Sequence, residues 1–134
     1  MTSKIIYTGN LRTEATHLKS GNTIITDAPT DNNGKGEAFS PTDLVATALG
    51  SCMLTIMGIK AANSNIDMAG AEVEVTKIMS ADPRRISKII ATINMPKKEF
   101  SDHEKKVLEK AAMHCPVFNS LSSKLEEEIK VVWQ

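Results

Sequence analysis

The sequence predicts one domain of the α+β class, spanning residues 1–134. Segments rich in β-branched residues fill the first quarter of the chain, and alternation of apolar and polar residues returns in the second half. Between them lies a long apolar stretch with a clear helix start. A chain of this length can bury the core of a single domain, and it contains no repeats or linkers.

The first third of the chain is predicted to form strands joined by turns. Residues 4–9 and 13–18 carry strand-forming side chains, and a Ser-Gly-Asn turn precedes the β-branched residues 23–26. Residues 27–39, DAPTDNNGKGEAF, are dense in Asp, Asn, Gly and Pro. We expect a loop there, and its length favours a binding or active-site role.

A helix is predicted from Pro41 to about Ala62. Ser40 is a good N-cap, and Pro41 suits the first helical position because its missing N–H would have no partner. Asp43 can close a capping box with Ser40, although Glu or Gln is more usual there. Because this helix is apolar on nearly every face, we expect it to be buried at the centre of the fold. Its small residues leave room for another backbone to approach closely: Ala48, Gly50, Ser51 and Gly58.

The second half of the chain is predicted to be a hairpin, two helices and a strand. Residues 71–79 and 84–96 alternate like half-buried strands around an Ala-Asp-Pro turn. A helix follows, with a capping box between Ser101 and Glu104. The Cys115–Pro116 step breaks that helix and can begin a short one, with Cys115 as its N-cap, before a final strand at 128–133.

The charge balance argues against two classes of partner. Sixteen basic and sixteen acidic residues give a formal net charge of zero, and no basic patch or lysine-rich amphipathic stretch stands out. We therefore expect neither a nucleic-acid nor a membrane partner. The longest apolar stretch, residues 44–62, is too interrupted for a membrane span, and the N-terminus lacks the apolar core of a signal peptide. We expect a cytoplasmic protein, in which a lasting structural disulfide is disfavoured.

The two cysteines, Cys52 and Cys115, are the candidate reactive groups. They form no Cys-x-x-Cys pair, so we expect no metal and no cofactor. No histidine stands in a local signature of a Cys-His hydrolase. Two readings stay open, namely inert thiols in the core or a redox pair. Small residues surround Cys52, and Cys115 precedes a helix whose N-terminus favours a thiolate, as a two-cysteine peroxidase requires.

Two segments carry a family resemblance. FSPTDLVATALGSCMLTI, residues 39–56, together with HCPVFNSL, residues 114–121, resembles the OsmC/Ohr family of thiol-dependent peroxidases. The order of predicted elements is similar along nearly the whole chain. The resemblance implies an OsmC-like fold, with antiparallel sheets around buried central helices in an intertwined homodimer. Its active sites would be built from both subunits.

The resemblance also implies roles for three residues. Cys52 would be the peroxidatic cysteine and Cys115 the resolving one, with a dithiol as reductant. Arg12, in GNLRTEATH, lies where an arginine of the family stabilises the thiolate. The alternative for Arg12 is a solvated arginine on a strand.

One position departs from the family pattern. The peroxidase branches place a glutamate directly after the helix-opening proline, where it orients the arginine, but this chain has Thr42 there. Asp43 could replace that glutamate or serve only as a cap. One residue along a helix rotates a side chain by about 100°, so the replacement is not automatic. Glu14 and Glu37 are the other candidates.

The expected function is a thiol peroxidase that reduces small organic hydroperoxides in oxidative-stress defence. The apolar surroundings of Cys52 favour an alkyl hydroperoxide over hydrogen peroxide. The expected pocket wall consists of Phe39, Leu49, Met53 and Phe118. The alternative is a dimeric redox sensor or small-molecule-binding protein whose thiols are oxidised slowly or not at all, and Thr42 is the residue that favours it.

Overall fold

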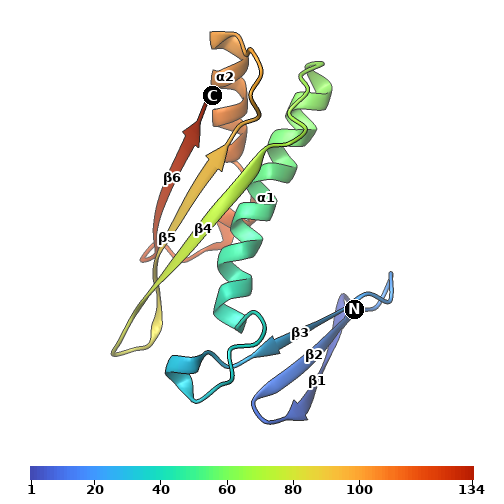
Figure 1. The fold of residues 1–134 in the computed structure, drawn as a ribbon, viewed down its shortest axis with the longest axis vertical. Coiled ribbons are helices and arrows are strands. Elements are labelled where there is room, and N and C mark those ends of the chain that lie inside the picture. The colour runs from blue at the N-terminus through green and yellow to red at the C-terminus, as the bar shows by residue number, and fades with distance from the viewer. The chain divides into compact units, whose positions relative to one another are not determined.

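A computed structural model describes residues 1–134, which form two compact units, residues 1–45 and 46–134. Each unit contains its own three-stranded sheet (Figure 1). The helix α1 (Pro41–Asn63) begins in the first unit and continues through the second.

The N-terminal unit is an antiparallel sheet of three strands in the order β1-β2-β3. Its strands are β1 (Ser3–Gly9), β2 (Arg12–His17) and β3 (Thr23–Asp27), so the three predicted strands are confirmed. A tight turn joins β1 to β2 through Asn10 and Leu11, both with positive φ, as a type I′ hairpin turn requires. This turn places Arg12 at the first position of β2.

The predicted loop after β3 is confirmed and contains one short 3-10 helix, η1 (Thr30–Asn32). It folds back on the end of β3 through backbone hydrogen bonds. The N–H of Asp27 donates to the Phe39 carbonyl at 3.0 Å, and the N–H of Gly36 donates to the Ala28 carbonyl at 3.3 Å. The loop is therefore anchored at the strand end where Arg12 and Asp27 lie.

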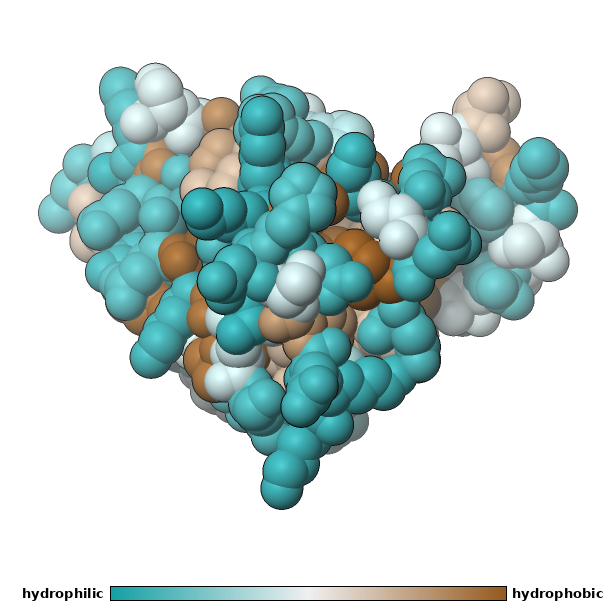
Figure 2. All heavy atoms as spheres, turned by 90° about the horizontal axis from the view of Figure 1, so that it is seen from above, coloured by the Kyte–Doolittle hydropathy of each residue, from teal (hydrophilic) through white to brown (hydrophobic).

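The N-terminal sheet keeps most of its large apolar side chains exposed. Because neighbouring residues of a strand point to opposite faces, apolar residues at consecutive positions leave both faces uncovered. Hydrophobic side chains also reach the surface shown in Figure 2. The exposed residues of this sheet are Ile5, Ile6, Tyr7, Ile24 and Ile25.

The C-terminal unit holds a second sheet in the order β4-β5-β6. In the sequence, the helices α2 and α3 come between β5 and β6. β4 (Glu72–Ser80) and β5 (Arg85–Asn94) form the predicted antiparallel hairpin. The predicted helices are confirmed as α2 (Asp102–Ala112) and α3 (Pro116–Ser120).

The pairing of the last strand corrects the expectation of antiparallel sheets. β6 (Glu126–Val132) pairs with β5 in the parallel direction, so the second sheet is mixed. The reason is the connection between them, because α2 and α3 carry the chain back to the end of the sheet where β5 began. Parallel neighbours require such a crossover.

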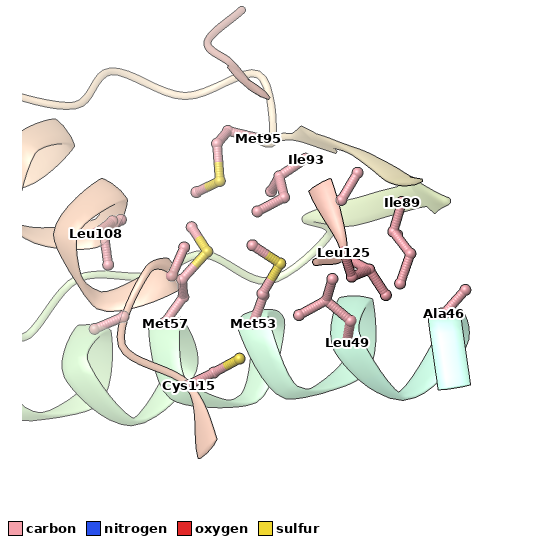
Figure 3. Close-up of a cluster of buried hydrophobic side chains, with 13 residues drawn as sticks. Ala46, Leu49, Met53, Met57, Ile89, Ile93, Met95, Leu108, Cys115 and Leu125 are labelled. Carbon is pink, nitrogen blue, oxygen red and sulfur yellow. The ribbon is translucent and has the colours of Figure 1, made fainter. Parts of the chain in front are cut away.

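One face of α1 packs against the second sheet. Figure 3 shows Leu49, Met53 and Met57 projecting from the helix towards side chains that include Ile93 and Met95. The spacing of four residues keeps these side chains on one face of the helix. The expectation of a helix buried on all sides is wrong within the chain, because α1 leaves Val45 and Ile59 exposed.

The small residues of α1 serve different purposes. A Cβ at Gly50 would lie 2.8 Å from Val75 Cγ2, so this glycine lets side chains of β4, rather than another backbone, approach the helix. A Cβ at Gly58 would meet nothing within 4 Å, and Ala48 and Ser51 are exposed. Of these four small residues of α1, only Gly50 is required by close packing within the chain.

By length and composition, α1 is the one helix that would suffice for a membrane span. The core helices of soluble proteins pass the same test. Here a set of α1 side chains is buried in the core: Ala46, Leu49, Gly50, Met53, Met57 and Ala61.

Both predicted capping boxes form. At α1, the N–H of Asp43 donates to Ser40 Oγ at 3.1 Å, and the N–H of Ser40 donates to Asp43 Oδ2 at 3.0 Å. At α2, the N–H of Glu104 donates to Ser101 Oγ at 3.1 Å, and the N–H of Ser101 donates to Glu104 Oε2 at 2.8 Å. Reciprocal bonds of this kind satisfy two helix-terminal donors at once.

Replacing Ser101 by Ala should lower the free energy of unfolding by about 1 kcal/mol, because the N–H of Glu104 loses its acceptor. Urea denaturation measures the change. Ser101→Asp keeps an acceptor at the cap and should retain most of the stability. An Ala variant as stable as wild type would show that this cap contributes nothing.

Candidate active site

The two cysteines lie together in the C-terminal unit. Cys52, in the middle of α1, is half-buried, and Cys115 is fully buried; both are free thiols. Cys52 packs against the core cluster that contains Cys115, close enough to influence the Cys115 pKa, although a hairpin and α2 separate the two in the sequence. Figure 3 shows the Cys115 side chain beside α1. The fold thus brings an accessible thiol next to one shielded from solvent.

The Cys-Pro step fixes the position of Cys115. α2 ends at Ala112, and Cys115 is the N-cap of α3, as predicted. The N–H of Phe118 donates to Cys115 Sγ at 3.2 Å. Pro116 is the first residue of α3, where its missing N–H removes no hydrogen bond.

The environment of Cys115 keeps its thiol protonated. Burial raises its pKa, and the neighbouring Cys52 thiol adds to the rise, although the N–H groups of Phe118 and Val117 act in the opposite direction. The expectation that the start of α3 would favour a thiolate at Cys115 is therefore wrong, because burial outweighs two backbone donors.

Arg12 is held in the N-terminal unit by two carboxylates. Its Nε donates to Asp27 Oδ1 at 2.7 Å and its Nη2 to Asp27 Oδ2 at 2.8 Å. The same Nη2 donates to Glu37 Oε2 at 3.2 Å, and the N–H of Glu37 donates to Asp27 Oδ2 at 3.1 Å. Arg12 and Asp27 are direct partners across β2 and β3, so the sheet register itself produces this bidentate pair.

In the cluster of Arg12, Asp27 and Glu37, the two main partners differ in burial. The Asp27 side chain is 3% exposed, whereas that of Arg12 is 33% exposed. Hydrogen bonds from Arg12 hold the pKa of Asp27 below its ordinary value, against the effect of burial. The same bonds raise the pKa of Arg12 further above neutrality. Arg12 is thus a permanently charged cation with a fixed orientation.

Asp27 was missing from the candidates to orient Arg12. The sequence places it at the start of an Asp-rich loop, whereas the structure makes it the last residue of β3. The signal that could have revealed it is the register of the hairpin between β2 and β3, because the Ser-Gly-Asn turn sets Arg12 opposite Asp27.

The other candidates to orient Arg12 divide between the cluster of Arg12, Asp27 and Glu37 and the N-cap of α1. Glu37 joins Arg12, whereas Asp43 caps α1. Thr42 Oγ1 lies 3.2 Å from Ser40 Oγ and belongs to the same cap. Glu14 is exposed, two residues along β2 from Arg12.

The predicted apolar pocket wall needs correction. Leu49 and Met53 are fully buried in the core, because they lie on the face of α1 that packs on β5, whereas Cys52 faces a different direction. Phe118 is half-buried beside the core, and Phe39 is exposed in the N-terminal unit. Only the last two keep surface that a substrate could contact.

The described side chains offer no site for a metal, since no group of three or more His, Cys, Asp or Glu residues is placed to hold one.

A family model described as OsmC-like protein matches residues 34–130. The chain belongs to the OsmC-like family. No curated protein matches the chain significantly.

Solved structures extend this assignment. A Psychrobacter arcticus protein, provisionally described as an osmotic stress induced and detoxification response protein, is 52% identical, with a TM-score of 0.94 over 98% of this chain and 96% of its own. The OsmC-like protein of Mycoplasma pneumoniae has 19% identity and a TM-score of 0.81 over 98% and 94%. The Legionella pneumophila organic hydroperoxide resistance protein OsmC has 15% identity and a TM-score of 0.76 over 98% and 96%. The α+β fold of this OsmC-like chain is therefore shared with these proteins.

Proposed function

We propose that this OsmC-like protein is a cysteine-based peroxidase that reduces organic hydroperoxides in oxidative-stress defence. The observation that carries the proposal is the contact between Cys52, which is partly accessible, and Cys115, which is fully buried. A peroxidatic thiol must meet its substrate, whereas a resolving thiol needs only to reach the oxidised product.

The first step forms one S–O bond and breaks the peroxide O–O bond. The Cys52 thiolate attacks the distal oxygen of ROOH and becomes a sulfenic acid, while the alkoxide leaves and takes up a proton as ROH. Two electrons pass from sulfur to the peroxide. Only the thiolate is nucleophilic enough for this attack.

The second step uses Cys115. Its sulfur attacks the Cys52 sulfenic acid, its own proton leaves with the hydroxyl group as water, and a disulfide forms. Because the environment of Cys115 raises its pKa, the proton is still present when the sulfenic acid forms. A dithiol then reduces the disulfide by thiol–disulfide exchange and returns the enzyme to its starting state.

Arg12 is proposed to stabilise the Cys52 thiolate and the leaving oxygen. A guanidinium suits this task because it stays charged at every relevant pH and offers several donors in a fixed plane. Asp27 and Glu37 would orient it. This assignment gives Asp27 the positioning role that peroxidase branches of the family give to the glutamate after the helix-opening proline.

Organic hydroperoxides are the favoured substrates for two reasons. Family members from Legionella pneumophila and Elizabethkingia anophelis are organic hydroperoxide resistance proteins. Apolar side chains also remain half-buried near the core beside the thiols, Phe118 among them. We place the reaction in the cytoplasm, where dithiol reductants keep the two cysteines reduced.

Reduced protein should consume cumene hydroperoxide catalytically when dithiothreitol is supplied, and it should consume hydrogen peroxide more slowly. The remaining peroxide is measured over time. The matched control is the Cys52→Ser variant, which accounts for direct reaction between peroxide and dithiothreitol. Equal or faster consumption of hydrogen peroxide would contradict the substrate assignment.

We also propose that the protein is a homodimer. The support is the N-terminal sheet, whose apolar side chains at consecutive positions stay exposed in the single chain, including Ile5, Ile6 and Tyr7. Soluble monomers rarely leave such patches uncovered.

Light scattering should give twice the mass of the chain. Ile24→Asp and Ile25→Asp test opposite faces of the sheet, and a wild-type monomer at micromolar concentration would refute the dimer.

A second function, slow redox sensing, is favoured by one observation. Two carboxylates hold Arg12, and these neutralise part of the charge that a thiolate would need. A sensor would form the same disulfide but would react slowly and without preference for organic hydroperoxides. The rate of oxidation distinguishes the two functions.

A further inference from the structure

The two sulfurs of the proposed Cys52–Cys115 disulfide differ in access. Cys115 has no exposed surface, at 0%, whereas Cys52 is half-buried. Cys115 lies between α2 and α3 and belongs to the buried core of the C-terminal unit, against which Cys52 packs. Association with a second chain can only remove more surface from solvent, so the inaccessibility of Cys115 does not depend on the oligomeric state.

The direction of approach to Cys52 follows from how the disulfide forms. Attack on a sulfur of this kind occurs in line with the bond that breaks. Cys115 therefore reaches the Cys52 sulfenic acid opposite the S–O bond, and the hydroxyl group leaves on the side away from Cys115. That is the side from which the peroxide reached Cys52, and it is also the side from which a thiolate must approach to break the disulfide at Cys52.

The corresponding approach to Cys115 is closed. A thiolate that attacks this sulfur must come from the side away from Cys52. Because no part of Cys115 is exposed, protein atoms occupy that side. The fold would have to open locally before a reductant could reach Cys115.

The surroundings of Cys115 act in both directions on its departure as a leaving group. Burial raises its pKa, and a thiol with a raised pKa leaves more slowly. The N–H of Phe118, which donates to Cys115 Sγ at 3.2 Å, stabilises the negative charge on the departing sulfur. A raised pKa slows departure in a graded way, whereas a closed approach prevents attack altogether until the fold opens. Access therefore decides which sulfur is attacked.

We propose that the dithiol reductant attacks the Cys52 sulfur of the disulfide and that Cys115 is the leaving group. A bond forms between the reductant sulfur and Cys52 while the Cys52–Cys115 bond breaks. The electron pair of that bond goes to Cys115, which takes up a proton. The second thiol of the reductant then loses its proton and attacks the reductant sulfur bound to Cys52, which closes the reductant's own disulfide and releases the Cys52 thiolate.

This step rests on the proposed function and adds to it. The dithiol loses two electrons and the protein disulfide gains them. The Cys52 sulfur then receives both substrates from the same side, the peroxide first and the reductant second, while Cys115 meets neither of them.

Trapping with a monothiol tests the step, because a monothiol cannot close a ring and leaves a mixed disulfide. Wild type is oxidised with diamide, exposed briefly to 2-mercaptoethanol and alkylated with N-ethylmaleimide. The cysteines lie in different tryptic peptides, residues 36–60 and 111–124, so mass spectrometry locates both labels. We expect mercaptoethanol on Cys52 and maleimide on Cys115, in about tenfold excess over the reverse arrangement.

The same trapping in concentrated urea is the control. Unfolding removes the burial of Cys115, so the two arrangements should then form in similar amounts. Mercaptoethanol mainly on Cys115 in the folded protein would overturn the proposal, as would the same distribution with and without urea.

Failure of the proposed function gives a different result. Diamide forms the disulfide whether or not the protein reduces peroxides. If cumene hydroperoxide leaves the reduced protein unoxidised while diamide forms the disulfide, the peroxidase function fails, and the trapping result still decides which sulfur a thiol attacks. If diamide also forms no Cys52–Cys115 disulfide, both proposals are overturned.

Discussion

Replacement of Cys52 by Ser should reduce peroxidase turnover more than about 10³-fold, because the hydroxyl group is not a nucleophile at neutral pH and no sulfenic acid can form. Cumene hydroperoxide consumption with dithiothreitol measures the loss. The substitution replaces one sulfur atom by oxygen at a half-buried position, so the fold should persist.

Cys115→Ser is the matched variant and should behave differently. Cys52 should still react once with peroxide, but the sulfenic acid has no partner within the chain and proceeds to sulfinic acid. Intact mass should therefore rise by two oxygens in Cys115→Ser and stay unchanged in Cys52→Ser. Stable sulfinic acid at residue 115 in the Cys52 variant would reverse the assigned roles.

Asp27→Asn should lower kcat/KM for cumene hydroperoxide by about 10²-fold, because Arg12 loses the bidentate partner that fixes its plane. An amide offers one acceptor oxygen in place of two, so the paired bonds to Oδ1 and Oδ2 cannot both form, and a misplaced cation stabilises the thiolate poorly. Glu37→Gln is the control, since Glu37 makes one longer hydrogen bond to Arg12 and its side chain is 63% exposed. Glu37→Gln should lower kcat/KM much less than Asp27→Asn does.

Labelling of Cys52 in the Asp27→Asn variant distinguishes a role of Asp27 in positioning Arg12 from a role in stability alone. If Arg12 stabilises the thiolate, iodoacetamide should label Cys52 more slowly in Asp27→Asn at pH 6, while both proteins are folded. Unchanged labelling with lower stability would mean that the pair is only structural. Equal turnover in Asp27→Asn and wild type would remove Asp27 from the site.

Acid should narrow the stability difference between wild type and Asp27→Asn. The pKa of Asp27 is lower in the folded protein than its ordinary value of 3.8, because Arg12 donates to it. Its carboxylate therefore stabilises the fold above that value, and this contribution is lost as pH falls through the lower, folded pKa. Urea denaturation at pH 7 and below pH 4 measures the change.

Local signals in the sequence were read correctly. Both capping boxes, the Cys-Pro helix junction and the three N-terminal strands were predicted and are present, because each depends on residues close together in the chain. The parallel pairing of β6 was missed because it depends on how a connection of two helices crosses the sheet.

The candidate site shows the same division. Cys52, Cys115 and Arg12 were selected from motifs, but Asp27 became visible only through the register of two strands. Leu49 and Met53 were placed in a pocket because they neighbour Cys52 in sequence. Neighbours on a helix point in different directions, and the packing of α1 on β5 decides which of them are buried.

The central claim, that Cys52 and Cys115 form a peroxide-reducing pair, is tested most directly by stopped-flow oxidation of the reduced wild-type protein. Cumene hydroperoxide and hydrogen peroxide are compared, and intact mass is read at the end. The account predicts fast oxidation by cumene hydroperoxide, slower oxidation by hydrogen peroxide, and the loss of two hydrogens as the Cys52–Cys115 disulfide forms. Slow oxidation, alike for both peroxides, would contradict it.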